Sequence, residues 1–490
     1  MKKGGEDKKE EVVFSLISHT NVGKTALART LLREDVGEVA DSAHVTVVPE
    51  SYLLIEEGEE SARLWDTPGF GANLAKLAKR LRSSENPVGW ILHQVWDRHA
   101  DKSLWCSQEA VRNVQAESDV VFYLVDASQS PESLGYIDLE LDVIEWIGKP
   151  VIVFLNQSGQ ASPEKRKIVE REWRERLAKH EVVRHLATLD AFTRCWTEEH
   201  HLFELASDVL EGSKKKVARN LAQAWERRSL ETFHEAMGIM GAWASKTLAD
   251  TEPLGSQGLL DRFKLLLSRS TRDRELDRIQ EAMYERLAKD TSKTVNELIA
   301  LHGLDGETAS ELASTSKEEF LVKRDLEEPL AATIGGAVSG LVGGLSADLI
   351  SGGMTFGGGA IVGMLLGGTT TYALAKGYNL TRTDQNLVRW NEGHFLGQVK
   401  FLVMLYLAIS HYGRGRGIWQ DPVNNPGHWE ERLDSSLEAA AASWKALWKK
   451  GGAKSDRNEL GRKATREFTG LIGSVLGDLY PDSVELFRRS

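Results

Sequence analysis

Residues 12–25 read VVFSLISHTNVGKT, and this stretch decides the fold of the first part of the chain. Its first half is apolar and β-branched, which favours a buried strand. Its second half is a small-residue loop that ends in Gly-Lys-Thr. Such a loop, placed before a helix, aims backbone N–H groups at a phosphate, as in the pattern Gly-x-x-x-x-Gly-Lys-Ser/Thr. Ser18 stands at the first glycine of that pattern, and an ordinary strand-to-helix turn is the alternative.

The loop residues have distinct expected roles in holding a nucleotide. Lys24 is expected to reach the β- and γ-phosphates, and the Thr25 hydroxyl is expected to hold Mg²⁺. The backbone of the loop and of the first helical turn supplies further donors. The nucleotide-binding residues predicted in this segment are Asn21, Val22, Gly23, Lys24, Thr25 and Ala26.

A second motif follows the predicted strand 62–66. The strand leads into Asp66-Thr67-Pro68-Gly69, a sequence that also suits a simple turn. An aspartate at the end of a neighbouring strand is where a phosphate-loop fold holds Mg²⁺. Gly69 has no Cβ, so its N–H can approach the γ-phosphate. The order of phosphate loop, Thr46 and Asp66 is the layout of a small GTPase.

On these motifs, residues 11–212 resemble a GTPase of the Era/TrmE type. The resemblance implies that Asn21 helps to bind K⁺ and that Thr46 closes on Mg²⁺ as the switch I threonine. It makes Lys24, Thr46 and Gly69 the catalytic residues, and Thr25, Thr46 and Asp66 the Mg²⁺ ligands. Phe70 stands where Ras-like proteins carry a water-orienting Gln. An apolar ring cannot orient water, so slow hydrolysis is expected; packing beneath switch II is the other interpretation.

The base-recognition motif departs from this class. The predicted strand 151–155 ends at Asn156-Gln157-Ser158-Gly159, where the class has Asn-Lys-x-Asp. Asn156 and Gln157 remain predicted nucleotide-binding residues, and Asn156 is a candidate to tie the base loop to the phosphate loop. Loss of the Asp carboxylate removes an acceptor for two guanine donors, which costs about 1–3 kcal/mol. A general NTPase with relaxed base specificity is therefore kept beside a GTPase, unless another group such as Asp190 replaces the carboxylate.

Length and composition set the organisation of the chain. A chain of 490 residues is too long for one ordinary domain. Its net charge of -11 argues against a nucleic-acid partner, and its two cysteines suit a reducing cytoplasm. Alternating strands and helices predict an α/β domain with a mostly parallel sheet, and an all-α domain follows. The expected divisions are a charged tail at 1–10, the GTPase-like domain at 11–212, helices at 213–328, a Gly-rich apolar hairpin at 329–375 and helices at 376–490. Within the helical regions we expect one long helix at 272–300, a core helix within 395–412, and terminal helices at about 428–449 and 456–488.

The segment 329–375 is the second informative region. Glycines recur every four residues in each of its two arms, at 336, 340 and 344 and again at 359, 363 and 367. This glycine zipper lets two helices approach closely, and each arm is long enough to cross a bilayer. A membrane-inserting helical hairpin and a tightly packed hairpin in a soluble domain are both consistent with the sequence.

An Era-like domain followed by helices and such a hairpin resembles a bacterial family of GTPases that carries a C-terminal domain of unknown function. We therefore predict a GTP- and GDP-binding switch with Mg²⁺, slow hydrolysis and a helical region that associates with the membrane. The expected location is the cytoplasm, at the inner membrane. A soluble regulatory NTPase that binds a protein effector is the alternative, and a pore or scaffold gated by nucleotide is a third. A homodimer is also left open.

Overall fold

The computed structural model describes residues 10–34, 36, 46, 48–71, 81–94, 102–157, 163–191, 196–253, 269–303, 380–382, 387–411 and 427–488. The expected hairpin at 329–375 and the Ser158-Gly159 pair lie outside these residues, so both stay predictions. The chain divides into two compact units. The first comprises residues 1–230, 410–420 and 479–490, and the second comprises 231–409 and 421–478. The boundary falls inside the helix α8 (Gly212–Ala249).

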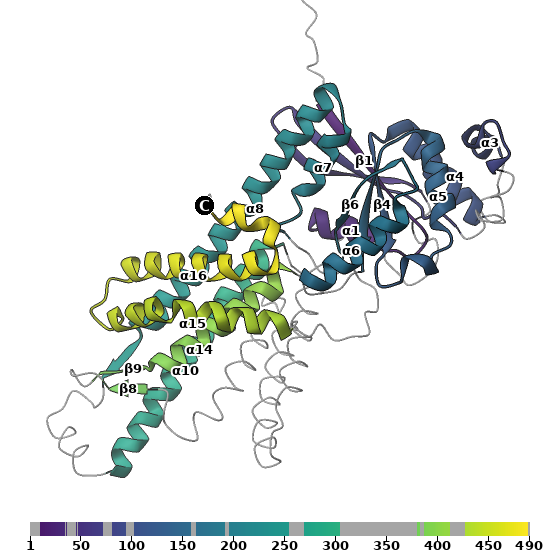
Figure 1. Ribbon diagram of the computed structural model, residues 1–490. Helices are drawn as coiled ribbons and strands as arrows, with labels where there is room; N and C mark the ends of the chain where they lie inside the picture. Colours follow the sequence, from purple (N-terminus) through teal and green to yellow (C-terminus); the bar gives the residue numbers. More distant parts are fainter. Residues whose placement is uncertain are drawn as a thin grey trace, which may run out of the picture. The chain divides into compact units, whose positions relative to one another are not determined.

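The first unit is built on a six-stranded sheet with the spatial order β2-β3-β1-β4-β5-β6 (Figure 1). Only the β2–β3 pair is antiparallel, so the mostly parallel sheet expected from the sequence is confirmed. Parallel neighbours bring their carboxyl ends to one edge of the sheet. The strands are β1 (Glu10–Ser18), β2 (Glu50–Glu57), β3 (Glu60–Asp66), β4 (Val120–Asp126), β5 (Val151–Asn156) and β6 (Val183–Thr188).

Both faces of the sheet are covered, which explains its continuous apolar strands. Alternate residues of β4 belong to two separate hydrophobic clusters, with Phe122 on one face and Tyr123 on the other. The first cluster includes α1 (Lys24–Leu32), α7 (His201–Val209) and the start of α8. The second includes α3 (Pro87–His93), α4 (Lys102–Glu117), α5 (Ile137–Ile147) and α6 (Pro163–Leu177). Together they form a three-layer α/β domain.

The long insertion after Gly69 packs against its own domain where the structure describes it. Leu81, Val88 and Ile91 are buried in the second hydrophobic cluster. The Gln108 side-chain amide on α4 donates to the backbone oxygens of Ile91, Leu92 and Gln94 at 2.8–3.1 Å. These bonds satisfy carbonyl groups that the short helix α3 leaves unpaired at its end.

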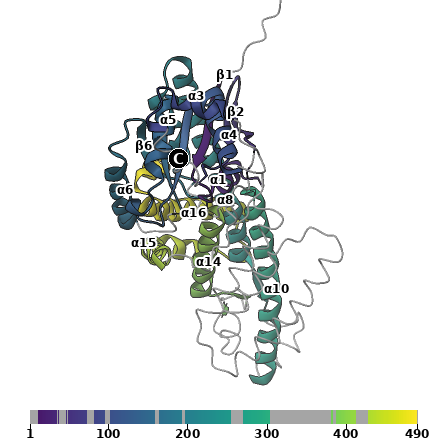
Figure 2. The ribbon, with the colours of Figure 1, turned by 90° about the vertical axis from the view of Figure 1, so that its right-hand side faces the viewer.

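The second unit is largely helical, as expected (Figure 2). The long helix predicted at 272–300 is α10 (Arg269–Leu301). The helices α15 (Gly427–Lys450) and α16 (Arg457–Leu479) run antiparallel, since Ser436 contacts Ser474 and Ser443 contacts Glu467. A Cβ on Gly241 of α8 would lie 2.9 Å from the Gly461 oxygen of α16, so α8 and α16 cross closely. The unit also contains α14 (Glu392–Ser410).

Three features differ from the sequence expectation. The strand β6 was missed because its sequence, VRHLAT, lacks the regular alternation of apolar and polar residues that marks a half-buried strand. The second unit also holds a small sheet, β7-β9-β8 (Thr251–Pro253, Leu387–Trp390 and Leu380–Arg382), so it is not purely helical. A helix was expected over 456–488, but α16 ends at Leu479. Pro481 has no N–H and disfavours helix at the preceding residue, and the short α17 (Val484–Arg488) follows.

Among the described residues, one helix, α14, is long and apolar enough to cross a membrane by length and composition. It lies inside the second unit. Lys400 on this helix pairs with Glu430 and Asp434 of α15, and Phe395 contacts the Trp444 ring. These contacts agree with the core helix expected for this segment.

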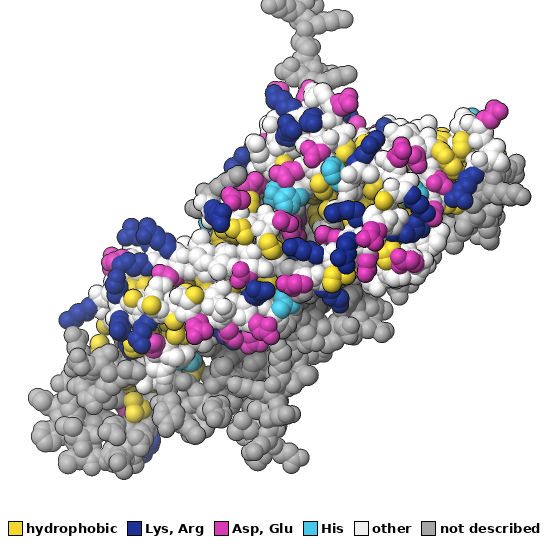
Figure 3. Space-filling model, in the orientation of Figure 1, with side chains coloured by type: hydrophobic (Ala, Val, Ile, Leu, Met, Phe, Trp, Pro, Cys, Tyr) yellow, Lys and Arg dark blue, Asp and Glu magenta, His cyan; other side chains and the backbone are white. Residues whose placement is uncertain are grey.

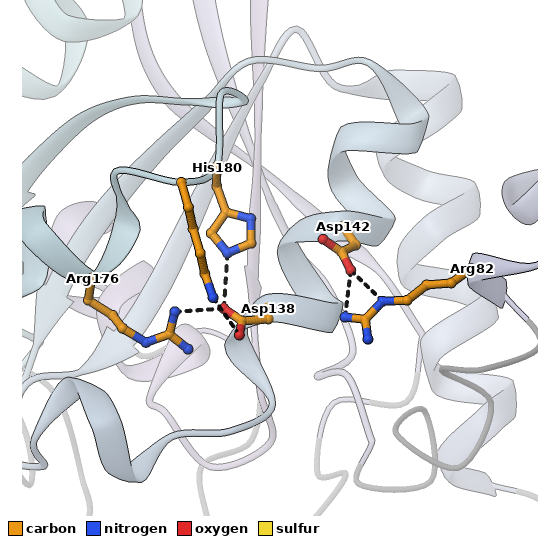
Figure 4. Close-up of polar contacts among 6 residues, drawn as sticks. Arg82, Asp138, Asp142, Arg176 and His180 are labelled. Atoms are coloured by element: carbon orange, nitrogen blue, oxygen red, sulfur yellow. Dashed lines mark hydrogen bonds and ion pairs between the residues drawn. The ribbon is translucent and has the colours of Figure 1, made fainter.

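A charged cluster joins α5 to the end of α6 (Figure 4). Asp138 accepts hydrogen bonds from Arg176 and Lys179, each at 2.7 Å, and lies 3.0 Å from His180. Partial burial acts to raise the pKa of the Asp138 carboxyl, but these three partners outweigh burial and hold the pKa well below its usual range. Asp142 on the same helix meets only Arg82 in this view, and Arg82 is half exposed.

We predict that Asp138→Asn lowers the thermal unfolding midpoint at pH 7 by a few degrees, consistent with about 1 kcal/mol. Asp142→Asn is the matched control and should cost less. Because the folded-state pKa of Asp138 is depressed, its contribution is complete above the ordinary aspartate pKa of about 4 and is lost progressively as the pH falls from that value towards the lower folded-state pKa. Thermal scans at several pH values measure this. Equal losses in the two variants, or a loss that grows on acidification, would contradict the assignment.

Candidate functional site

The phosphate loop begins where β1 ends. Ser18 has no positive φ, so the missing glycine imposes no backbone strain there. Its hydroxyl accepts a hydrogen bond from the Lys24 ammonium at 3.1 Å. The positive φ values of the loop belong to Asn21, at 65°, and Gly23, at 94°, residue types that tolerate this conformation. The serine that replaces the usual glycine therefore gives the Lys24 ammonium an uncharged hydrogen-bond partner.

Asn156 ties the phosphate loop to the ends of two other strands. Its side-chain nitrogen donates to the Val22 oxygen at 2.6 Å, and its side-chain oxygen accepts from the Ala191 N–H at 2.8 Å. The side chain is fully buried. A Cβ on Gly23 would lie 2.8 Å from the Asn156 amide nitrogen, so only glycine fits at that point. The link between the base loop and the phosphate loop that the sequence suggested is present.

Three oxygen-bearing side chains converge beside Lys24. The Thr25 hydroxyl donates to Asp66 Oδ2 at 2.5 Å. The Thr46 hydroxyl lies 3.0 Å from the Thr25 hydroxyl and 3.3 Å from Asp66 Oδ2. The other carboxylate oxygen, Asp66 Oδ1, is buried and has no hydrogen-bond partner among the residues that the structure describes. A buried oxygen of this kind needs a cation or a donor that reaches it.

Burial dominates the electrostatics of this cluster. It raises the pKa of the Asp66 carboxyl, while the charge of Lys24 and the bond from Thr25 act in the opposite direction. It also lowers the pKa of the Lys24 ammonium, which the charges of Asp66 and Glu140 oppose. The two groups therefore depend on each other to stay ionised. A bound cation would add to the forces that keep Asp66 charged.

The residues after Asp66 are joined to the phosphate loop. The Phe70 N–H donates to the Ser18 oxygen at 2.9 Å, and the Thr20 N–H donates to the Phe70 oxygen at 3.2 Å. A Cβ on Gly69 would lie 2.9 Å from Thr20 Cα and 3.1 Å from Lys24 Nζ. The Phe70 ring is 1 % exposed and belongs to the hydrophobic cluster beneath this loop. The packing expected for Phe70 is therefore present, and its buried ring carries no polar atom.

The sequence analysis missed a hydrogen-bonded group that contacts the phosphate loop through His19. His19 Nδ1 lies 2.7 Å from Glu140 Oε1, and the Tyr123 hydroxyl donates to Glu140 Oε2 at 2.7 Å. The His19 ring also stacks on Tyr136 at 4.0 Å. Burial raises the pKa of the Glu140 carboxyl, and the bond to His19 opposes this. This contact leaves little signal in the sequence, because Glu140 is one of four acidic residues on α5 and lies 121 positions from His19.

At the base loop, Gln157 has a positive φ of 57°, and its side-chain nitrogen lies 3.4 Å from the Val22 oxygen. Asp190 is buried beside Ala191, next to the Asn156 link. The residues predicted from the sequence thus gather at the carboxyl ends of β1, β3 and β5. They are Asn21, Val22, Gly23, Lys24, Thr25, Ala26, Thr46, Asp66, Gly69, Asn156 and Gln157.

The sheet order, the phosphate loop and the Asp66 motif define a P-loop GTPase. In agreement, residues 13–157 match the family described as 50S ribosome-binding GTPase. Residues 174–469, more than half of the chain, match the family described as domain of unknown function DUF3482. The chain belongs to this DUF3482 family. No curated protein matches it.

Solved structures resemble the chain at low identity. A variant of Aquifex aeolicus Era bound to GDP·AlF4⁻ is 19% identical over 41% of this chain, with a TM-score of 0.30. Era with MgGDPNP and nucleotides 1506–1542 of 16S ribosomal RNA is also 19% identical over 41%, with a TM-score of 0.31. The chain spans 58% of the length of both. One chain of an oligomerised bacterial dynamin pair is 11% identical over 98% of this chain and 84% of that chain, with a TM-score of 0.25.

We predict that Gly69→Ala weakens binding of a non-hydrolysable GTP analogue at least about tenfold but changes GDP binding less than about threefold. A Cβ at position 69 would push the backbone away from Thr20, so the N–H of residue 69 would no longer reach the γ-phosphate. Titration of the full-length protein with fluorescent nucleotides measures both affinities. Gly135→Ala is the matched control, because a Cβ there meets nothing within 4 Å. Unchanged affinity for the GTP analogue in Gly69→Ala would contradict the assignment.

Proposed function

We propose that this protein is a guanine-nucleotide-dependent switch of the Era/TrmE type with slow intrinsic hydrolysis. The observation that carries the proposal is the cluster of Thr25, Thr46 and Asp66 beside Lys24. It joins the phosphate loop, the switch I threonine and the Asp motif within hydrogen-bond distance. Binding of the γ-phosphate would order Thr46 and Gly69 together, and this would switch the protein from its GDP-bound to its GTP-bound state.

The residues fit Mg²⁺. Hydroxyl and carboxylate oxygens are the ligands that this ion prefers, and Asp66 Oδ1 is a buried oxygen without a hydrogen-bond partner in the described part of the chain. Thr25, Thr46 and Asp66 would hold the ion, which supplies positive charge against the phosphate oxygens when bound. Lys24 adds a second positive charge beside the same cluster. Asn21 lies on the exposed part of the loop, where it would contribute an oxygen to K⁺.

Slow hydrolysis follows from the surroundings of Phe70. Its ring is committed to the hydrophobic cluster, so the position that carries the water-orienting glutamine in Ras-like proteins supplies no polar atom. Water must then be oriented by backbone groups, a cation, a second copy of the chain or a partner protein. In this proposal Lys24, Thr46 and Gly69 stabilise charge on the transferred phosphate and do not activate water.

Base specificity is the weakest link to guanine. Gln157 lies along the phosphate loop, where it can pack beside a base as the usual lysine does. Asp190, buried next to Ala191, is the carboxylate nearest in sequence to the Asn156 link. An NTPase with relaxed base specificity is the alternative, and the substitution at Gly159 is the observation that favours it.

The helical region is proposed to associate with the inner membrane from the cytoplasm through residues 329–375. Its support is the sequence alone: two apolar arms with regularly spaced glycines. The alternative output is a protein effector bound by a soluble helical domain, and a homodimer stays open. The expectation of no nucleic-acid partner also stays a prediction, because it rests on the net charge alone.

Flotation with vesicles tests the proposed switch and its output together. Full-length protein would be mixed with vesicles of phosphatidylethanolamine and phosphatidylglycerol, with either GDP or a non-hydrolysable GTP analogue. We expect the protein to float with the vesicles, and the floating fraction to differ between the two nucleotides. Thr46→Ala keeps the phosphate loop but removes the switch I hydroxyl, so it should abolish that difference.

Two other outcomes separate the alternatives. Protein that stays at the bottom of the gradient with either nucleotide contradicts membrane association and supports the soluble regulator. Equal flotation with both nucleotides, unchanged in Thr46→Ala, contradicts the switch and supports a constitutive anchor or scaffold. Thr469→Ala in α16 is the matched control, since among the described residues its hydroxyl bonds within its own helix, to the Thr465 oxygen at 2.9 Å.

A further inference from the structure

A second group of ligand-type side chains lies at the start of α7, separate from the residues of the nucleotide site. His200, His201 and Glu204 each offer one ligand atom, and these atoms all lie within 4.8 Å of one another. The two imidazole rings are 4.2 Å apart, and His201 Nε2 lies 3.7 Å from Glu204 Oε2. Figure 3 shows that histidine side chains also gather beside acidic ones on the surface.

The surroundings keep the first of these imidazoles neutral. His200 is 6 % exposed, and burial lowers its pKa to about 4, with the neighbouring His201 acting in the same direction. A positive charge at a helix N-terminus is also unfavourable. Neutral imidazole is the form that binds metal ions, so no proton has to be removed from His200 at neutral pH. The side chains of His201 and Glu204 are 33 % and 53 % exposed, which leaves access from solvent.

The turn that carries the histidines is held in place by three other elements. Glu199 accepts a hydrogen bond from the Trp225 indole of α8 at 3.3 Å, and Glu198 pairs with Arg166 of α6 at 3.6 Å. The Ser483 hydroxyl donates to the Thr197 oxygen at 3.3 Å. Ligands on a fixed backbone lose little freedom on binding, which is the condition for a metal site with useful affinity.

The chain offers one comparable group among its described residues, and that group is already occupied by protein. Asp142, Glu145 and His180 also bring ligand atoms within 4.8 Å. However, Asp142 accepts two bonds from Arg82 at 2.7 and 3.0 Å, and His180 lies 3.0 Å from Asp138 (Figure 4). A cation there would have to displace a guanidinium and break the Asp138 cluster. This group is therefore an internal control for the first.

We propose that His200, His201 and Glu204 bind a divalent transition metal ion. Two imidazoles and one carboxylate suit Zn²⁺ and its neighbours, whereas Mg²⁺ and Ca²⁺ prefer ligand sets made of oxygen. Three protein ligands leave a further coordination position for water or a partner's side chain. The bound ion would link His200, in the turn before α7, to His201 and Glu204 in the first turn of that helix.

Metal analysis of the untagged full-length protein tests this site. The protein would be stripped with a chelator, saturated with Mg²⁺ and GDP so that the nucleotide site is filled, and titrated with Zn²⁺. Co²⁺ would serve as a coloured replacement whose visible spectrum reports coordination by nitrogen. We expect one Zn²⁺ per chain. His201→Gln and Glu204→Gln should each weaken binding at least about tenfold.

Both replacements are at partly exposed positions, so circular dichroism should show unchanged folding. His180→Gln is the matched control, because it removes an imidazole from the other group and should leave Zn²⁺ binding unchanged. Failure of the wild-type protein to bind Zn²⁺ stoichiometrically would overturn the proposal. Loss of binding in His180→Gln, with binding retained in His201→Gln, would equally overturn it and move the metal to the Asp142 group.

Discussion

Two opposite charges, Lys24 and Asp66, are buried together at the carboxyl edge of the sheet, and the site depends on keeping both ionised without water. Burial works against both charges, shifting each pKa towards the neutral form. Thr25, Ser18 and Glu140 supply the compensating bonds and charge. Such an arrangement is costly unless further charge is bound. A phosphate beside Lys24 and a cation beside Asp66 would each supply such charge. The burial that disfavours both charges in the free site therefore favours binding of these ligands.

The site could be predicted from the sequence wherever its chemistry is local. The loop from Ser18 to Thr25 and the motif at Asp66 are short runs whose residue types follow from what phosphate and Mg²⁺ require. The pair of His19 and Glu140 could not be found in this way, because Glu140 lies on α5, 121 positions from the phosphate loop, and no local pattern joins the two residues. The burial of Phe70 likewise required the packing of α3 and the helices beside it.

The fold shows the same division. Strands buried on both faces, such as β4 and β5, and long periodic helices, such as α10, were predictable because their signal runs over many residues. The edge strand β6 and the short strands β7, β8 and β9 gave little sequence signal. Strands of three or four residues, such as the last three, form mainly because of the strands with which they pair. Residues 174–469 match the DUF3482 family, and the role of this region stays a proposal.

The most direct test of the account is a titration of purified full-length protein with GTP and ATP analogues, in K⁺ and in Na⁺ buffers. Lys24→Ala serves as the control that removes phosphate binding. The account predicts guanine binding at least about tenfold tighter than adenine, a difference of about 1.4 kcal/mol, and loss of both in the variant. Equal affinities, or a preference for adenine, would contradict it, because the base loop at Asn156 and Gln157 would then no longer read guanine.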